Sequence, residues 1–239
     1  MNYFDRILIK DWKFILSTGL EVRKTEPDSD QMLSLRRLII EIINFLDERL
    51  RVPEEREVLK ALTNVSLEKE NYIYQKPNVP PKEDTFLLAV SSIRKKALIP
   101  IKEAIVFASS NFRWNIDKGS FYDKNSNIGQ EYFGGNMNTE LVGPKNGNYW
   151  SADCRLGLFL LEPEIFYKDH KHEAPELYIN LTNGTYWRFE DKVWTEKKSA
   201  SIIYNKPERI HAMKVNNQPF LSVWCWPYNS SKKCIVVNR

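Results

Sequence analysis

The chain contains three histidines, and all of them lie where a single metal ion could use them. His170 and His172 are separated by one residue, Glu176 follows them closely, and His211 stands alone further along the chain. Neutral imidazole is a preferred ligand of several transition metals, and one carboxylate beside three imidazoles leaves coordination positions open for a substrate. We therefore expect these four residues to bind a divalent transition metal, which is Fe, Zn, Mn or Ni.

The composition is that of an ordinary globular protein. Of the 239 residues, 42% are hydrophobic and 28% are charged, and the formal net charge is +4. Basic residues are scattered among acidic ones, so we expect no nucleic-acid binding. Three cysteines without CxxC spacing favour a reducing compartment over a disulfide framework. Because no apolar run approaches the ~20 residues of a membrane span, we expect a cytoplasmic protein without membrane segments.

The first half of the chain has the hydrophobic period of helices. Apolar residues recur every three or four positions from Met32 to Leu50, after capping aspartates at residues 28–30 and before Pro53. This stripe suits either a core face or a dimer contact, which makes a homodimer possible. Helices are expected over Met32 to Leu50, Pro53 to Leu62, Phe86 to Leu98 and Ala104 to Ala108, with a connector at 66–83 and a kink or restart at Pro100.

From about Asn115 onward, short apolar runs alternate with clusters of Gly, Asn and Pro, which is typical of an all-β unit. Strands are expected over Leu156 to Leu161, Ile165 to Lys168, Leu177 to Leu181, Thr185 to Phe189, Ala200 to Tyr204, Ala212 to Val215 and Leu221 to Trp226. Short strands at this spacing favour a sandwich or a barrel. The expected fold is therefore α+β, with a helical N-terminal lobe at residues 1–114 and an antiparallel β-barrel at residues 115–239.

Strand geometry brings the candidate ligands together. Residues two apart on a strand share a face, so His170 projects with His172, and Glu176 projects with Tyr178. Two adjacent strands would then direct three ligands to one point. His211 would come from a third strand, because the inward faces of a barrel converge.

These residues resemble a known family. HKHEAPE is similar to the HxHx3E signature of the cupin superfamily, and His211 matches the histidine of the second cupin motif. More narrowly, residues 150–228 resemble the cupin-type dimethylsulfoniopropionate (DMSP) lyases. The narrower likeness depends on Tyr167, the ExY pair that ends at Tyr178, HAM at 211–213 and WxW at 224–226. Cupin motifs usually carry glycine where this chain has Glu164 and Glu208, so two turns must be built without glycine's freedom to take positive φ.

The resemblance implies a cupin double-stranded β-helix that splits the small molecule DMSP into dimethyl sulfide and acrylate by β-elimination. A metal on the four ligands would act as Lewis acid on the substrate carboxylate. Tyr178 is the expected base, because a nearby cation would favour its phenolate. Tyr167 is expected to transfer a second proton or to orient the substrate. A sulfonium has no N–H donor, so aromatic faces would bind it. The candidates for these faces are Trp187, Trp224 and Trp226, with Trp194 in the same segment.

Two alternatives stay open at this point. The same ligands can hold iron for oxygen chemistry, so the chain could be a cupin oxygenase or isomerase, because a fold does not select a reaction. It could also be a non-catalytic sensor of small molecules, with the helical half as its signalling or dimerisation element. That half shows no basic recognition helix, which argues against a DNA-binding sensor.

Overall fold

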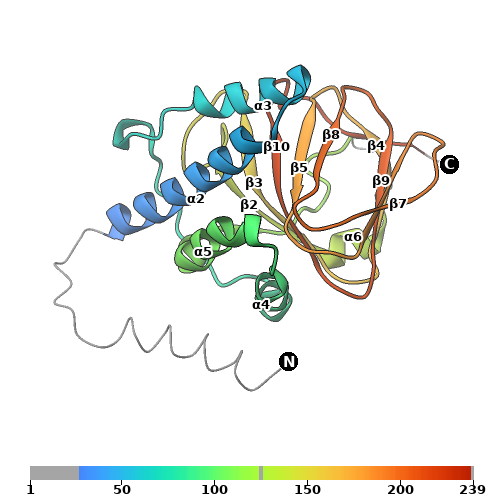
Figure 1. Ribbon diagram of the computed structural model, residues 1–239, viewed down its shortest axis with the longest axis horizontal. Coiled ribbons are helices and arrows are strands. Elements are labelled where there is room, and N and C mark those ends of the chain that lie inside the picture. Colours follow the sequence, from blue (N-terminus) through green and yellow to red (C-terminus); the bar gives the residue numbers. More distant parts are fainter. Residues whose placement is uncertain (1–26, 124–125, 238–239) are drawn as a thin grey trace.

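The computed structural model describes residues 27–123 and 126–237 of the chain. Helices come first and two antiparallel sheets follow, in the order that the sequence predicts (Figure 1). The part of the predicted helical lobe at residues 1–26 lies outside the described residues. Among the residues that are described, no helix is both long enough and apolar enough to cross a lipid bilayer.

The helices of the first half lie close to their predicted positions. The first begins at Pro27, so the aspartates at residues 28–30 lie within its first turn rather than before it. The second begins at Pro53 with Glu54 and Glu55 in its first turn, where acidic side chains interact favourably with the helix dipole. The helices are α2 (Pro27–Arg49), α3 (Pro53–Thr63), α4 (Glu83–Ser92) and α5 (Ile99–Ala108), with the short 3-10 helices η1 (Lys69–Asn71), η2 (Lys96–Leu98) and η3 (Ser109–Asn111).

One helix is shorter than predicted. The sequence predicts a helix that continues to Leu98, whereas α4 ends at Ser92. Ile93 leaves the helical conformation, with φ −70° and ψ 107°, and buries its side chain. Its carbonyl oxygen accepts a 3.1 Å hydrogen bond from Nζ of Lys102, which ties the break to the next helix. That helix, α5, has Pro100 in its first turn, so the predicted restart at this proline is confirmed.

The second half forms two facing antiparallel sheets, which is the arrangement of a cupin double-stranded β-helix and confirms the predicted fold class. The six-stranded sheet has the order β1-β2-β3-β10-β5-β8, and the five-stranded sheet has the order β11-β4-β9-β6-β7. All the strands that the sequence predicts are present. The strands are β1 (Trp114–Asn115), β2 (Asn136–Val142), β3 (Arg155–Leu161), β4 (Phe166–Lys171), β5 (Glu176–Asn180), β6 (Thr185–Phe189), β7 (Thr195–Lys197), β8 (Ile202–Asn205), β9 (His211–Val215), β10 (Phe220–Trp226) and β11 (Ile235–Val236).

The strand β2 and the helix α6 (Gln130–Gly135) were not predicted, because they lie in a stretch whose glycines and asparagines indicate only turns. In β2, polar side chains are buried beside apolar ones, among them Asn136, Thr139 and Glu140. The strand therefore lacks the alternation that would identify it. Pairing with β1 on one side and with β3 on the other holds it in the sheet, so tertiary contacts override the local pattern.

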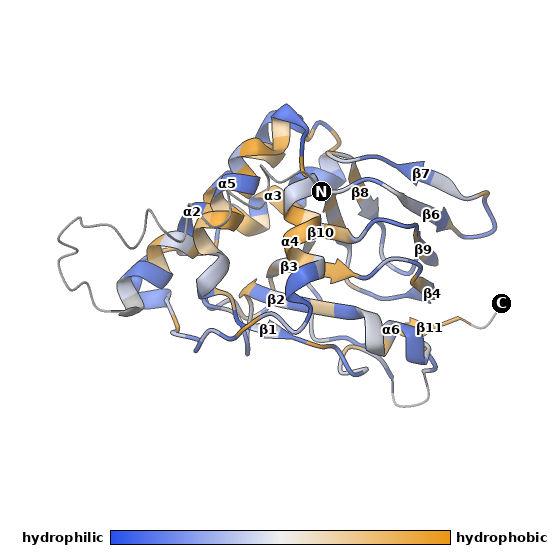
Figure 2. Ribbon diagram, turned by 90° about the horizontal axis from the view of Figure 1, so that it is seen from below, coloured by the Kyte–Doolittle hydropathy of each residue, from blue (hydrophilic) through white to orange (hydrophobic). Residues whose placement is uncertain are grey.

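Strand β10 separates two hydrophobic cores. Val223 and Cys225 belong to the core shared with the helices, whereas Trp224 and Trp226 belong to the core between the two sheets. Figure 2 shows the helices α2 to α5 gathered on one side of β2, β3 and β10. The predicted apolar stripe of α2 is buried in the first core, so its role is that of a core face, and the homodimer stays a prediction. All three cysteines are buried free thiols, and the cytoplasmic location stays a prediction.

The two turns that carry glutamate in place of the cupin glycine keep a glycine-like conformation. Glu164 has φ 64° and Glu208 has φ 60°, so both turns take positive φ without a glycine. A residue other than glycine pays roughly 1–2 kcal/mol in this region. Hydrogen bonds hold the turns there: the amide of Glu164 donates to the carbonyl of Asn216 at 3.0 Å, and the amide of Glu208 donates to the carbonyl of His172 at 2.9 Å.

Candidate metal centre and active site

The three histidines lie together between the sheets. His170 in β4 pairs with His211 at the start of β9, and His172 follows the end of β4. One ring nitrogen of each histidine lies within 4.8 Å of those of the other two, and all three side chains are buried. This is the spacing of donors that share one metal ion.

Each of the three imidazoles forms a hydrogen bond with a backbone carbonyl. A carbonyl oxygen only accepts hydrogen bonds, so each Nδ1 must carry the proton, and the lone pair of each neutral ring is left on Nε2. Metal-binding histidines are commonly oriented in this way. The pairs are Nδ1 of His170 with the carbonyl of Lys168 at 2.8 Å, Nδ1 of His172 with that of Ala174 at 2.6 Å, and Nδ1 of His211 with that of Arg209 at 2.9 Å.

The carboxylate of Glu176 completes the cluster from the facing sheet. Its Oε2 lies 3.3 Å from Nε2 of His172 and 3.5 Å from Nε2 of His211. Asn205 donates a 3.0 Å hydrogen bond to the same oxygen, and Trp226 donates one of 2.8 Å to Oε1. The prediction of adjacent ligand strands is wrong in one respect. The chain crosses between the sheets after β4, so β4 pairs with β9 while β5 lies opposite.

The protonation of these groups suits a cation. Burial, together with the other two imidazoles, lowers the pKa of His170 well below 6.5, and burial lowers the pKa of His211. Burial raises the pKa of Glu176, but the neighbouring imidazoles of His172 and His211 outweigh it and hold that pKa well below its usual value. Nε2 of His211 is buried without a hydrogen-bond partner among the described residues. Neutral imidazoles at His170 and His211 beside an ionised carboxylate form a donor set that fits a divalent transition metal.

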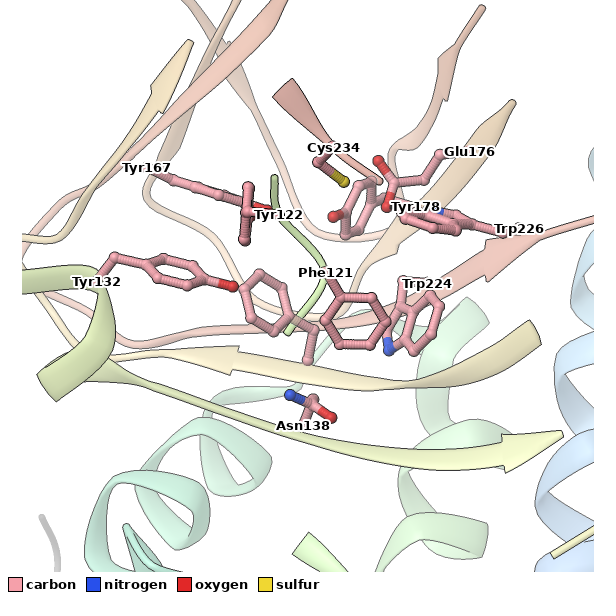
Figure 3. Close-up of a pocket in the computed structure, with 11 residues that line it drawn as sticks. Phe121, Tyr122, Tyr132, Asn138, Tyr167, Glu176, Tyr178, Trp224, Trp226 and Cys234 are labelled. Atoms are coloured by element: carbon pink, nitrogen blue, oxygen red, sulfur yellow. Dashed lines mark hydrogen bonds between the residues drawn. The ribbon is translucent and has the colours of Figure 1, made fainter. Parts of the chain in front are cut away.

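A cavity of about 50 Å³ opens beside Glu176 (Figure 3). By volume it holds on the order of four water molecules, so it suits a small substrate. Its wall is aromatic apart from a carboxylate, an amide and a thiol. The lining residues are Phe121, Tyr122, Tyr132, Asn138, Phe159, Tyr167, Glu176, Tyr178, Trp224, Trp226 and Cys234.

Of the predicted site residues, the structure brings Glu176 and four aromatic side chains to the wall of this cavity, whereas the three histidines are not among its lining residues. Tyr167, Tyr178, Trp224 and Trp226 line it. Trp187 lies behind Tyr178, with 5.1 Å between ring centroids, and is not part of the lining.

Trp194 lies apart from the cavity. It contacts Phe166, Arg188 and Lys214, with which it lines a separate hollow. Strand alternation directs Arg188 and Lys214 away from the neighbouring Trp187 and Met213, which lie in the core between the sheets. Trp194 therefore belongs to the outer side of the five-stranded sheet.

Sequence reasoning missed one wall of the cavity. Phe121, Tyr122 and Tyr132 come from the segment between the helices and the sheets, which was interpreted only as turns. The aromatic pairs at 121–122 and 132–133, set among Gly, Asn and Asp, were the available signal. Cys234 gave none, because it reaches the cavity only through the pairing of the C-terminal segment with Tyr122.

Comparison with solved structures finds similar folds. A chain from the crystal structures of the DMSP lyases RdDddP and RnDddQII is 16% identical with a TM-score of 0.64, and the match covers 87% of this chain and 100% of that one. The DMSP lyase DddQ from Ruegeria pomeroyi DSS-3 is 16% identical with a TM-score of 0.62, over 89% of this chain and 98% of that one.

Comparison of sequences identifies the family. No curated protein matches the chain. The sequence model of the DMSP lyases matches residues 56–222, which include His170, His172, Glu176 and His211 and most of the helices. The match spans well over half of the chain, and the chain therefore belongs to the DMSP lyase family.

Proposed function

We propose that this protein is a metal-dependent lyase that splits DMSP into dimethyl sulfide and acrylate. Membership of the family supports the substrate. The observation that carries the proposal is the convergence of three backbone-oriented imidazoles on Glu176, at the polar end of a small aromatic cavity. DMSP has the matching polarity, with a carboxylate at one end and a sulfonium at the other.

The metal would be held by Nε2 of His170, His172 and His211 and by the carboxylate of Glu176. Bound there, a divalent cation would supply Lewis-acid chemistry, neutralising charge on the substrate carboxylate and favouring the phenolate form of a neighbouring tyrosine. Three imidazoles and a carboxylate suit Fe, Zn, Mn and Ni alike, so we propose the class of metal rather than one element.

Tyr178 is the proposed base. It lies two residues after Glu176 on the buried strand β5, lines the cavity and is packed from behind by Trp187. Burial and the charge of Glu176 raise the pKa of Tyr178 well above its usual value, so its phenolate forms only where a positive charge offsets them. Its Oη would take the proton from the carbon next to the substrate carboxylate. The C–H electron pair then forms the double bond of acrylate as the C–S pair leaves with dimethyl sulfide.

The tryptophan wall of the cavity suits the leaving group. The rings of Trp224 and Trp226 lie 6.1 Å apart at 77°, and both are buried walls of the cavity. A sulfonium cation is attracted to the faces of such rings and needs no hydrogen-bond acceptor. Tyr167, on the side of His170, is proposed to orient the substrate.

Release of dimethyl sulfide tests the proposal. Metal-loaded protein is incubated with DMSP without oxygen, dimethyl sulfide is measured in the headspace, and acrylate is measured in solution. We expect equal amounts of the two products, and loss of both after treatment with a chelator. Absence of release by fully loaded protein would refute the proposed reaction, and a requirement for oxygen would indicate an oxygenase instead.

A further inference from the structure

The ring of Tyr167 lies between two other rings. On one side it stacks on His170, with 4.3 Å between centroids and an angle of 23°. On the other side it stacks on Tyr132, at 4.7 Å and 22°. Its hydroxyl forms a hydrogen bond with the hydroxyl of Tyr122. All four side chains are buried, so Tyr167 is held by both of its faces and by its polar end.

A break in the pairing of strand β4 lies beside this stack. Tyr167 pairs with Met213 and His170 pairs with His211, so three steps along β4 match two steps along β9. The extra residue is a β-bulge, which allows Tyr167 and His170 to face the same side although they are three positions apart. A bulge disrupts the regular ladder, so pairing alone does not fix the direction of the His170 ring.

Asp117 anchors the far end of the stack. The hydroxyl of Tyr132 donates a 3.1 Å hydrogen bond to Oδ2 of this buried carboxylate. Its Oδ1 accepts hydrogen bonds from the amides of Gly119 and Ser120 at 3.0 and 2.9 Å, and one of 2.9 Å from the Ser120 hydroxyl. The carboxylate therefore organises the turn that leads directly to Tyr122.

Asn136 secures the same turn to the sheet. Its Oδ1 accepts a 2.8 Å hydrogen bond from the amide of Asp117, and its Nδ2 donates to the carbonyls of Asp117 and Tyr132 at 2.9 and 2.7 Å. Figure 3 shows Tyr122, Tyr132 and Tyr167 together on the side of the cavity opposite Trp224 and Trp226. The two segments that carry Tyr122 and Tyr132 are thus joined at one point.

We propose that Asp117, Tyr122 and Tyr132 are positioning residues of the metal centre. They hold the Tyr167 phenol flat on His170, and so fix the direction of Nε2 of that imidazole. The inference rests on the proposed function in that it takes His170 as a metal ligand. None of the three residues is a ligand itself, and each acts through Tyr167.

Cobalt binding tests this inference without turnover. Co²⁺ is titrated into metal-free protein, its dissociation constant is measured by competition with a chelator, and its visible spectrum reports the ligand geometry. Tyr132→Leu removes the stacked ring, Tyr122→Phe removes only the hydroxyl bonded to Tyr167, and Tyr132→Phe restores the stack. We expect Tyr132→Leu and Tyr122→Phe to bind Co²⁺ roughly tenfold more weakly with an altered spectrum, and Tyr132→Phe to recover most of the affinity.

A matched control comes from the helical core. Tyr149 is fully buried, and its hydroxyl donates a 3.0 Å hydrogen bond to the carbonyl of Met32, away from the histidines. Tyr149→Phe should lower the urea midpoint of unfolding and leave Co²⁺ binding unchanged. A merely structural role for Tyr122 and Tyr132 would give the same pattern in their variants, with wild-type affinity and spectrum, and would overturn the inference.

Dimethyl sulfide release separates this inference from the lyase proposal. If the wild type releases no dimethyl sulfide but the variants bind Co²⁺ more weakly than it does, the positioning role is supported and the reaction is refuted. Unchanged Co²⁺ binding in variants of an active lyase would refute the positioning role alone. Failure of the wild type to bind Co²⁺ would refute the metal centre and the positioning role together.

Discussion

The indole Nε1 of Trp226 donates a 2.8 Å hydrogen bond to Oε1 of Glu176. Asn205 holds the other oxygen of the same carboxylate at 3.0 Å, so both oxygens are fixed by neutral donors. Trp226 also packs against the ring of His172, with 4.9 Å between centroids, and lines the cavity. We call Trp224 and Trp226, the rings proposed to bind the sulfonium, the sulfonium wall. One side chain, Trp226, thus joins this wall to the proposed metal centre.

Trp226→Phe should therefore weaken metal binding as well as catalysis. The variant keeps an aromatic wall but leaves Oε1 of Glu176 buried without its donor, and we expect roughly tenfold lower metal affinity. A chelator competition measures the affinity, and headspace dimethyl sulfide measures turnover. Trp194→Phe is the control, because Trp194 lies with Arg188 and Lys214 outside the cavity and should keep wild-type values. Unchanged metal affinity in Trp226→Phe would contradict this role of the indole.

Tyr178→Phe should abolish turnover while the metal content stays near normal. The substitution keeps the packing against Trp187 and removes only the oxygen that is proposed to accept the α-proton. Elemental analysis gives the metal content, and dimethyl sulfide release gives the rate. Tyr186 is half-buried and precedes Trp187 in β6. The control variant Tyr186→Phe should remain fully active. Full activity of Tyr178→Phe would remove this residue as the base.

Gly157→Ala should damage the sulfonium wall through the backbone. Gly157 pairs with Trp224 across β3 and β10, and a Cβ there would lie 2.9 Å from Nε1 of Trp224 and 2.0 Å from the carbonyl oxygen of Thr139. Overpacking of this kind costs about 1–3 kcal/mol. We expect a lower urea midpoint and slower dimethyl sulfide release. Gly134→Ala is the control, since a Cβ at Gly134 has no described heavy atom within 4 Å, and equal behaviour of the two variants would contradict the prediction.

The helical core should respond to truncation on one face of α2 only. Leu38 is fully buried, whereas Leu33 on the same helix is 54% exposed. Leu38→Ala should lower the free energy of unfolding by about 2–5 kcal/mol, because it leaves a cavity in a packed core. Leu33→Ala should change it by less than about 0.5 kcal/mol. Urea denaturation measures both, and similar losses would show that the stripe is not a core face.

Acid should destabilise the metal-free protein. Burial lowers the folded-state pKa values of His170 and His211 below 6.5, so near that pH the unfolded chain binds protons that the folded chain does not. The free energy of unfolding then falls as the pH drops through 6.5. Glu176 adds to the loss at lower pH, because its folded pKa is depressed and its stabilisation disappears as the pH falls through that pKa.

His172 acts in the opposite direction. Burial lowers the pKa of His172, but the hydrogen bond and charge of Glu176 raise it by more, so the net shift is upward. The stabilisation that protonated His172 gives the folded state is therefore lost as the pH rises through the folded pKa. The folded-state pKa is lowered for two of these histidines and raised for one. We therefore expect the urea midpoint of unfolding to decrease as the pH drops below 6.5. His170→Gln should flatten this dependence. A midpoint that rises as the pH falls would contradict the assignment of neutral His170 and His211.

The ligand cluster could be predicted because its information is local. His170, His172 and Glu176 lie within a few residues of one another, so their side chains stay close although the chain crosses to the facing sheet between them. Tyr178 follows from the strand alternation after Glu176 on β5. The helices could be predicted for a similar reason, since the apolar period of α2 is visible over several turns.

The opposite wall of the cavity could not be predicted because it depends on contacts between distant segments. Tyr122 reaches Tyr167 through the turn at Asp117, and Cys234 reaches Tyr122 through a bridge from the C-terminal segment. Local sequence does not encode such pairings. The sequence predicts β4 beside β5, whereas the structure pairs β4 with β9. The reason is the same, since strand order in a sheet is decided by long-range packing.

The alternation along β10 connects the helical half to the wall of the cavity. Because Val223 and Cys225 lie against the helices while Trp224 and Trp226 line the cavity, one strand transmits the position of the lobe to the aromatic wall. Cutting the chain before Asn115 would expose the rear of that strand to water and free both indoles to move. The lobe thus supports the proposed substrate site from behind, and substitutions in its packing should alter substrate preference without changing a proposed metal ligand.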